Sequence, residues 1–166
     1  MEFAVLFLPL VGAIVGYFGK SLFKLFSEIT TSVFTSIAAI ISILIFYNGL
    51  VYGEYGNYQI LTWVNSGNFS ANWSINIDPL SSTMLVVITL ISALVHIYSI
   101  GYMSHDPFKP RFMSYLSLFT FSMIALVVSD NFLQLFFGWE GVGLCSYLLI
   151  GFWYKKNSAN NAAIKA

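Results

Sequence analysis

The chain has 166 residues, of which 58% are hydrophobic and 8% are charged, and its formal net charge is zero. Soluble domains carry about 25% charged residues, so this composition excludes an ordinary soluble domain and indicates a protein that lies in a lipid bilayer. Because the net charge is zero, the chain lacks the excess of basic residues that is typical of proteins that bind nucleic acid. The single cysteine, Cys145, excludes an internal disulfide and is interpreted as a small packing residue.

Five stretches are long and apolar enough to cross a hydrocarbon core of ~30 Å, which takes about 17–25 helical residues. They are residues 3–19, 29–51, 80–103, 112–129 and 131–153. The first lacks the basic start and the small-residue cleavage site of a signal peptide, so we interpret it as a membrane helix. The pattern predicts an all-α membrane protein in which residues 1–166 form one membrane domain.

The connection between the second and third predicted helices, residues 53–78, is polar and rich in asparagine and glycine. Two runs of strand-forming residues, 60–64 and 73–77, flank a turn with the sequence NSGNFSAN. This pattern predicts a small β-hairpin on the membrane surface. The third helix then begins at Asp78-Pro79, because proline is favoured in the first helical turn.

Lysine and arginine gather in the connections that follow the first, third and fifth predicted helices. These residues are Lys20, Lys24, Lys109, Arg111, Lys155 and Lys156. The three connections lie on one side if the helices alternate, and the other side contains acidic residues without lysine or arginine. The positive-inside rule therefore predicts that the basic connections face the cytoplasm or matrix. The N-terminus and the hairpin are then expected on the periplasmic or intermembrane-space side.

The last residues, 158–166, have the sequence SANNAAIKA, in which a serine that can cap a helix precedes helix-forming residues. They stop before a complete helix is formed. We interpret them as the start of a sixth helical element. The molecule is accordingly expected to be a fragment, or one piece of a split subunit.

Glu140 is the one charged residue within residues 131–153. A charge near the bilayer centre costs roughly 2.5–3.5 kcal/mol on insertion scales, so an ionisable residue at this depth indicates ion or proton movement. Gly138, Gly141 and Gly143 are expected to leave room for water or a neighbouring helix. A lysine at ~6 Å would interact with the carboxylate by about 3 kcal/mol at an effective dielectric constant of ~20. That exceeds the roughly 2.3 kcal/mol for moving one charge through 100 mV. The alternative is a structural glutamate bonded to a neighbouring helix.

Three further ionisable residues are candidate proton relays. His96 lies in the third predicted helix, with Ser92 and Ser99 one turn away on its face, and is either a hydrogen-bonded core histidine or a relay group. His105 belongs either to a helix-ending turn or to a proton entry on the basic side. Lys165 either extends to the membrane interface or takes part in the relay. The sequence contains no phosphate-binding loop, dinucleotide fingerprint or zinc-ligand spacing, so we expect no cofactor in this chain.

The fifth predicted helix is also specific in its residues. SDNFLQLFFGWEGVGLCSYLLIGFWY, residues 129–154, closely resembles the NADH dehydrogenase subunit 5 family, the distal antiporter-like membrane subunits of respiratory complex I. The same resemblance is carried by NIDPLS at residues 76–81, HIYSIGYMSHDP at residues 96–107 and NAAIKA at residues 161–166.

This resemblance implies a proton-translocating subunit of NADH:quinone oxidoreductase, in which Glu140 pairs with a lysine on a later helix. NADH, FMN, iron–sulfur clusters and quinone are then expected in partner subunits. The hairpin within residues 53–78 is expected to contact neighbouring membrane subunits, especially the adjacent antiporter-like subunit. Family members are much longer, so the chain would correspond to an N-terminal part. The implied location is the mitochondrial inner membrane or, alternatively, the bacterial plasma membrane.

Two other functions are compatible with the residues. The large subunit of a multi-subunit cation/proton antiporter shares the glutamate-bearing helix and needs neither NADH nor quinone. A structural membrane scaffold without transport activity would need only the packing properties of the helices.

Overall fold

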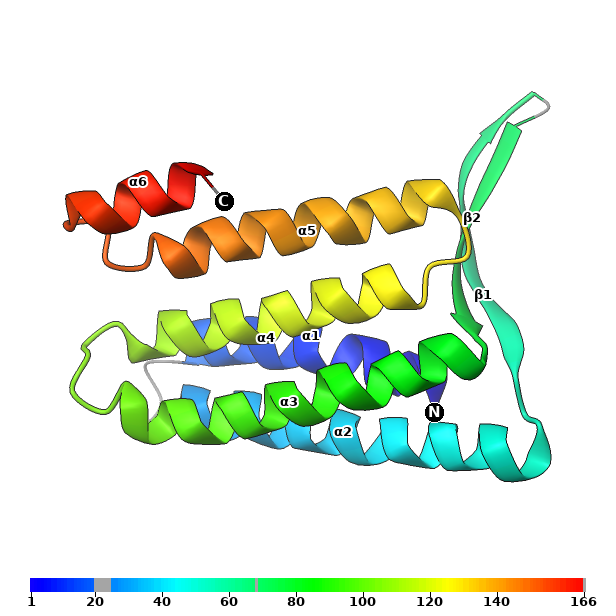
Figure 1. The fold of residues 1–166 in the computed structure, drawn as a ribbon, viewed down its shortest axis with the longest axis horizontal. Helices are drawn as coiled ribbons and strands as arrows, with labels where there is room; N and C mark the ends of the chain where they lie inside the picture. Colours follow the sequence, from blue (N-terminus) through cyan, green and yellow to red (C-terminus); the bar gives the residue numbers. More distant parts are fainter. Residues whose placement is uncertain (20–24, 68, 166) are drawn as a thin grey trace.

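The computed structural model describes residues 1–19, 25–67 and 69–165. Figure 1 shows a bundle of long helices lying side by side, a β-hairpin at one end of the bundle, and a short helix at the end of the chain beside the last long helix. In chain order the elements are α1 (Glu2–Phe18), α2 (Phe26–Tyr52), β1 (Gly56–Ser66), β2 (Phe69–Ile77), α3 (Pro79–Tyr102), α4 (Lys109–Val127), α5 (Phe132–Ile150) and α6 (Asn157–Lys165). The predicted helical membrane fold with a small hairpin is confirmed.

Four helices, α2 to α5, are long and apolar enough to cross a membrane, whereas α1 has 17 residues and falls at the short limit. All ten predicted helix ends agree with the structure to within three residues, and the starts of α2 and α4 and the end of α5 show the full three-residue difference. α4 differs by beginning at Lys109, because Pro110 fits the first helical turn. α5 ends at Ile150, and turns occupy residues 151–155. Lys20 and Lys24 lie outside the described residues.

The outer surface of the bundle is apolar, whereas much of its interior consists of hydroxyl-bearing side chains. Large residues such as Ile40, Leu94 and Phe132 are exposed. Buried hydroxyl residues occur on the facing sides of α2, α3 and α4; they include Thr31, Thr35, Ser42, Ser82, Thr89, Ser117 and Thr120. Lipid chains solvate an apolar exterior, and small side chains let helices approach closely without a water-driven hydrophobic effect. The distribution therefore fits a bundle surrounded by lipid.

Hydroxyl groups also connect the first four helices directly. Ser42 Oγ on α2 lies 2.7 Å from Thr89 Oγ1 on α3. Ser117 Oγ on α4 donates a hydrogen bond of 3.0 Å to the carbonyl oxygen of Pro9 on α1. Interhelical hydrogen bonds in membrane proteins contribute about 0.6 kcal/mol each on average, so they specify the packing more than they stabilise it.

α5 packs against α4 through small residues on one of its faces. A Cβ atom added to Gly138 would lie 2.6 Å from the backbone nitrogen of Leu126, which leaves no room for a side chain there. Cys145 is buried on the same face, in agreement with its predicted packing role. This close approach turns the opposite face of α5 away from the rest of the bundle.

The hairpin is longer than predicted and is joined to the connection between α4 and α5. Its strands pair antiparallel from Gly56 opposite Ile77 to Ser66 opposite Phe69, and Gly67 takes a left-handed conformation (φ 59°) in the turn. On the free edge of β2, Gln134 donates to the carbonyl oxygen of Ser74 at 2.7 Å and accepts from its N–H at 3.1 Å. The side chain of Gln134 is fully buried, so these two bonds hold the hairpin to the start of α5.

Replacing Gln134 by leucine keeps a similar volume but removes both hydrogen bonds to Ser74. Each buried polar group left without a partner costs about 1–3 kcal/mol. We therefore expect the β2 amides of Gln134→Leu to exchange roughly 10–100-fold faster. Hydrogen exchange on the full-length chain in nanodiscs measures the change.

The matched control is Gln59→Leu, because Gln59 lies exposed on the other strand. Equal exchange rates in the two variants would contradict a specific connection through Gln134.

Candidate functional site

Glu140 lies near the middle of α5 and points away from the bundle. It is exposed, and so are Phe136, Leu144 and Tyr147, which occur on the same helical face. Among the described residues, no hydrogen bond or ion pair is made by its carboxylate. The alternative of a glutamate bonded to a neighbouring helix therefore finds no partner within the described part of the chain.

Two of the glycines near Glu140 pack closely against a neighbouring helix. Of the three nearby glycines expected to leave room, Gly138 and Gly141 are occupied by contacts with α4, and only Gly143 faces open space. Room is provided instead by a hollow of about 470 Å³ between α4 and α5, which Glu140 borders together with Phe121 of α4. Gly138 and Gly141 therefore make room for a closely packed neighbouring helix, which is one of the two expected outcomes.

His96 is fully buried on α3 and bonded through one ring nitrogen. Its Nδ1 lies 2.8 Å from the carbonyl oxygen of Ser92, which can only accept, so Nδ1 carries the hydrogen. Ser92 Oγ is in turn hydrogen-bonded to Thr120 on α4. Nε2 is buried and has no hydrogen-bond partner among the described residues. In the neutral ring this nitrogen has a free lone pair, the group that a relay histidine needs.

The other two candidate relay residues lie at the surface. His105 is exposed in the turn after α3, and Lys165 is exposed at the end of α6. Within the described part of the chain, no hydrogen bond or ion pair connects either residue to Glu140 or His96. The neighbour of His105, Asp106, accepts hydrogen bonds from the Phe108 amide and from Trp153 Nε1, so this segment is an ordered turn.

A buried ion pair between Glu28 and Lys109 was missed by the sequence analysis. Their side chains are 3% and 9% exposed, and Lys109 Nζ lies 2.8 Å from Glu28 Oε2. Glu28 is in the first turn of α2, and Lys109 begins α4. Nothing in a single sequence indicates a pairing between two residues that are 81 positions apart, so the sequence analysis did not connect them. The pair leaves Lys109 partly neutralised, so it adds less to the basic side than the residue count implied.

The ionisable groups of the membrane helices therefore occur in two different environments. Glu28 and Lys109 neutralise each other where α2 and α4 begin. Glu140 has no cation beside it and lies on an apolar helix face. His96, with one nitrogen unpaired, is a second group that can accept a proton.

Comparison with known proteins gives two family matches. Residues 63–113 match the family described as NADH-ubiquinone oxidoreductase (complex I), chain 5 N-terminus. Residues 129–166 match the family described as NADH:quinone oxidoreductase/Mrp antiporter, transmembrane. The second match includes Glu140, His105 lies in the first, and Lys165 lies in the second.

Individual relatives cover nearly the whole chain. It is 51% identical over 163 residues to NADH-quinone oxidoreductase subunit L of Rickettsia bellii, covering 98% of this chain and 25% of the relative. It is 50% identical over 167 residues to NADH-ubiquinone oxidoreductase chain 5 of Arabidopsis thaliana, covering 100% of this chain and 25% of the relative. A protein of the latter name from Phytophthora infestans is 52% identical over 163 residues. The chain thus spans about a quarter of the length of these relatives.

Substitutions of Glu28 and Lys109 test whether they act as one pair. Removing one partner of a buried ion pair costs about 3–5 kcal/mol, because the other charge is left uncompensated, whereas replacing both is often nearly neutral. We therefore expect Glu28→Gln and Lys109→Met each to lower the free energy of unfolding, and the double variant to be more stable than either. Unfolding of the full-length chain in mixed micelles measures these differences.

If the free energy of unfolding of the double variant fell by the sum of the two single losses, the two side chains would contribute to stability separately. Glu54→Gln, an exposed change at the end of α2, is the control and should leave stability unchanged.

Proposed function

The chain belongs to the family of complex I chain 5 subunits, and from this premise we propose that it forms part of a proton-translocating membrane subunit of NADH:quinone oxidoreductase. Electron transfer from NADH to quinone would take place in partner subunits that hold NADH, FMN, iron–sulfur clusters and quinone. This chain would contribute membrane helices and ionisable side chains that couple electron transfer to proton movement. The names of the relatives and the apolar helices support this proposal.

The single observation that carries the proposal is the unpaired carboxylate of Glu140 halfway along an apolar helix. Its insertion costs roughly 2.5–3.5 kcal/mol, which stability alone does not require. A lysine brought to ~6 Å would favour the ionised form by about 3 kcal/mol. Withdrawal of that lysine would favour uptake of a proton. This lysine–carboxylate interaction energy is comparable with the roughly 2.3 kcal/mol that is needed to move one charge through a potential of 100 mV.

We assign His96 the role of a second proton-accepting group. Support comes from its buried Nε2, which lacks a hydrogen-bond partner among the described residues, and from the hydroxyl chain of Ser92 and Thr120 beside it. His105 and Lys165 have weaker support because both are exposed. They would act only at the ends of a proton path.

The partners of the subunit would be other membrane subunits of complex I, in particular the adjacent antiporter-like subunit. The hairpin is the element best suited to contact such a subunit, because it presents exposed Tyr58, Leu61 and Trp63. The membrane would be the mitochondrial inner membrane or the bacterial plasma membrane, since the relatives include plant and rickettsial proteins.

A second candidate function is cation/proton antiport without electron transfer. The description of the family matched by residues 129–166 includes the Mrp antiporter, and that match contains Glu140. Sodium-dependent proton transport that proceeds without NADH oxidation would favour this function. The relatives named above carry oxidoreductase names, which favours the complex I subunit.

Glu140→Gln removes the titrating carboxylate while keeping nearly the same shape. We expect the assembled complex to form normally and to oxidise NADH, but with proton pumping lost, because the amide cannot exchange a proton. Acidification assays on proteoliposomes that contain the complex measure the ratio of protons moved to NADH oxidised.

Glu54→Gln serves as the matched control, because Glu54 is an exposed glutamate outside the helices. Unchanged pumping in Glu140→Gln would reject the proton-site hypothesis and leave a structural scaffold. The same assay on His96→Gln tests the second group, since normal pumping there would limit His96 to packing.

The orientation is tested by cysteine labelling in a background with Cys145 replaced by alanine. Asn57→Cys in β1 and Ser104→Cys in the turn after α3 are exposed positions at opposite ends of the bundle. A membrane-impermeant maleimide added from the periplasmic or intermembrane-space side should label Asn57→Cys and spare Ser104→Cys. The reverse pattern would overturn the predicted topology.

A further inference from the structure

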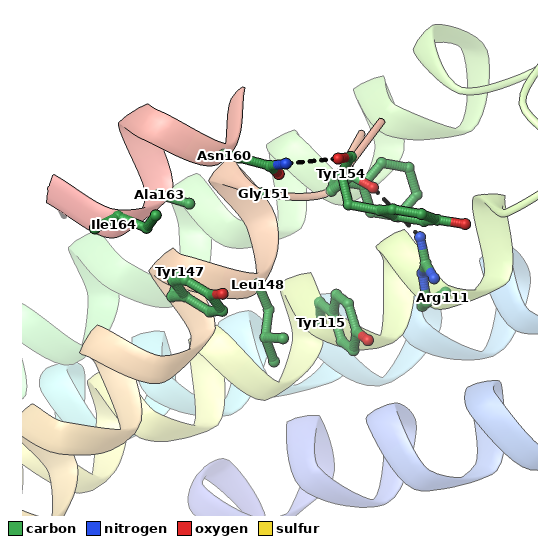
Figure 2. A pocket seen from close by; sticks show the side chains of 10 residues that line it. Arg111, Tyr115, Tyr147, Leu148, Gly151, Tyr154, Asn160, Ala163 and Ile164 are labelled. Carbon is green, nitrogen blue, oxygen red and sulfur yellow. Dashed lines mark hydrogen bonds between the residues drawn. The ribbon is translucent and has the colours of Figure 1, made fainter. Parts of the chain in front are cut away.

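A cavity of about 450 Å³ lies where α4 begins and α5 ends, with α6 closing one side. Figure 2 shows Arg111 and Tyr115 of α4 facing this space, Tyr147 and Leu148 of α5 beside them, and Ala163 and Ile164 of α6 opposite. The volume falls in the range of about 300–1,000 Å³ that is usual for small-ligand sites. Neither Glu140 nor His96 lines this cavity, so it is separate from the proposed proton site.

Arg111 gives the cavity a positive charge, and no carboxylate among the described residues forms an ion pair with it. Its guanidinium lies 5.0 Å from the ring centre of Phe108 and 4.9 Å from that of Phe152. Its one hydrogen bond among the described residues is a long contact of 3.4 Å from Nη2 to the carbonyl oxygen of Phe152. Nε is buried and has no hydrogen-bond partner in that part of the chain. The guanidinium is therefore held in place by two aromatic rings, while its hydrogen-bonding capacity is largely unused.

The residues around Arg111 combine hydrogen-bonding groups with an apolar wall. Tyr115, Tyr147 and Tyr154 have hydroxyl groups, and the amide of Asn160 is fixed by donating 2.7 Å to the carbonyl oxygen of Tyr154. Leu148 and Ile164 supply the apolar part. A ligand that fits this lining has an anionic oxygen-rich end and a hydrocarbon end. Guanidinium groups bind phosphate through two parallel hydrogen bonds, so Arg111 can hold a phosphate at the anionic end of such a ligand.

The position of the cavity favours a lipid over a soluble ligand. It opens at the level where two helices end, which is the depth of phospholipid head groups and of interfacial tyrosines. Lys155 and Lys156 are exposed in the adjoining turn. Basic residues near the cytoplasmic or matrix surface each attract anionic lipid by about 1 kcal/mol, and basic pockets between helices on that side bind anionic head groups.

We propose that this cavity binds the phosphate head group of an anionic phospholipid, with Arg111 contacting the phosphate and one acyl chain lying along Leu148 and Ile164. Bound there, the lipid would join α6 to α4 and α5 and fill a space that the side chains leave empty. The site does not depend on proton transfer, so its test is separate from that of Glu140.

The test uses the full-length chain reconstituted in nanodiscs of phosphatidylglycerol and phosphatidylcholine, then washed in mild detergent. Mass spectrometry of the retained lipids should find phosphatidylglycerol enriched on the unmodified chain. Losing one charge-assisted contact weakens binding by about tenfold or more. The Arg111→Gln variant should therefore retain correspondingly less phosphatidylglycerol. Arg111→Lys keeps the charge without the paired geometry and should fall between them.

Lys155→Gln is the matched control, because it removes the same charge from the same end of the bundle but does not line the cavity. It should retain clearly more phosphatidylglycerol than Arg111→Gln, because it weakens only the general attraction of the basic surface for anionic lipid. Equal loss in Lys155→Gln and Arg111→Gln would overturn the proposal in favour of general surface attraction. Unchanged retention in Arg111→Gln, or displacement by inorganic phosphate as effective as by short-chain phosphatidylglycerol, would also overturn it.

Discussion

The polar interior of the bundle is the constraint on which the rest of the structure depends. In lipid, every backbone polar group must be satisfied within the protein, which helices do along their length. Buried hydroxyls such as those of Thr31 and Thr35 on α2 follow the same rule, since each donates to a carbonyl one turn earlier, at 2.8 and 2.9 Å. Small hydroxyl residues then let α2, α3 and α4 approach closely, while the large apolar side chains face the bilayer.

This packing places Glu28 of α2 and Glu140 of α5 in opposite environments. Glu28 is enclosed by the bundle and neutralised by Lys109, which makes it part of the structure. Glu140 lies on the face of α5 that the close contact at Gly138 turns outward, where no described residue pairs with it. A carboxylate that contributes nothing to packing and raises the cost of insertion is best explained by function. The function that we propose for it is proton movement across a membrane, which is in keeping with the family matches of the chain.

The two ends of the bundle are specialised differently. At one end the hairpin is held to α5 through Gln134 and presents apolar side chains beyond the helices. At the other, Arg111 lies between two aromatic rings and faces a cavity closed by α6. The first arrangement suits contact with a neighbouring subunit, and the second suits contact with lipid. Glu140 and His96, the residues that we propose to exchange protons, lie between these ends, within the span of the helices.

The sequence by itself determined every feature that depends on neighbouring residues. Apolar runs defined the helices, strand-forming residues around a glycine turn defined the hairpin, and helical spacing placed Glu140 on one face with Phe136 and Leu144. Only the tertiary structure decided which distant residues meet. Three features depend on how whole helices pack: the pairing of Glu28 with Lys109, the close contact of two α5 glycines with α4, and the cavity at Arg111. Periodicity describes the faces of one helix, but it contains no information about which other helix covers each face.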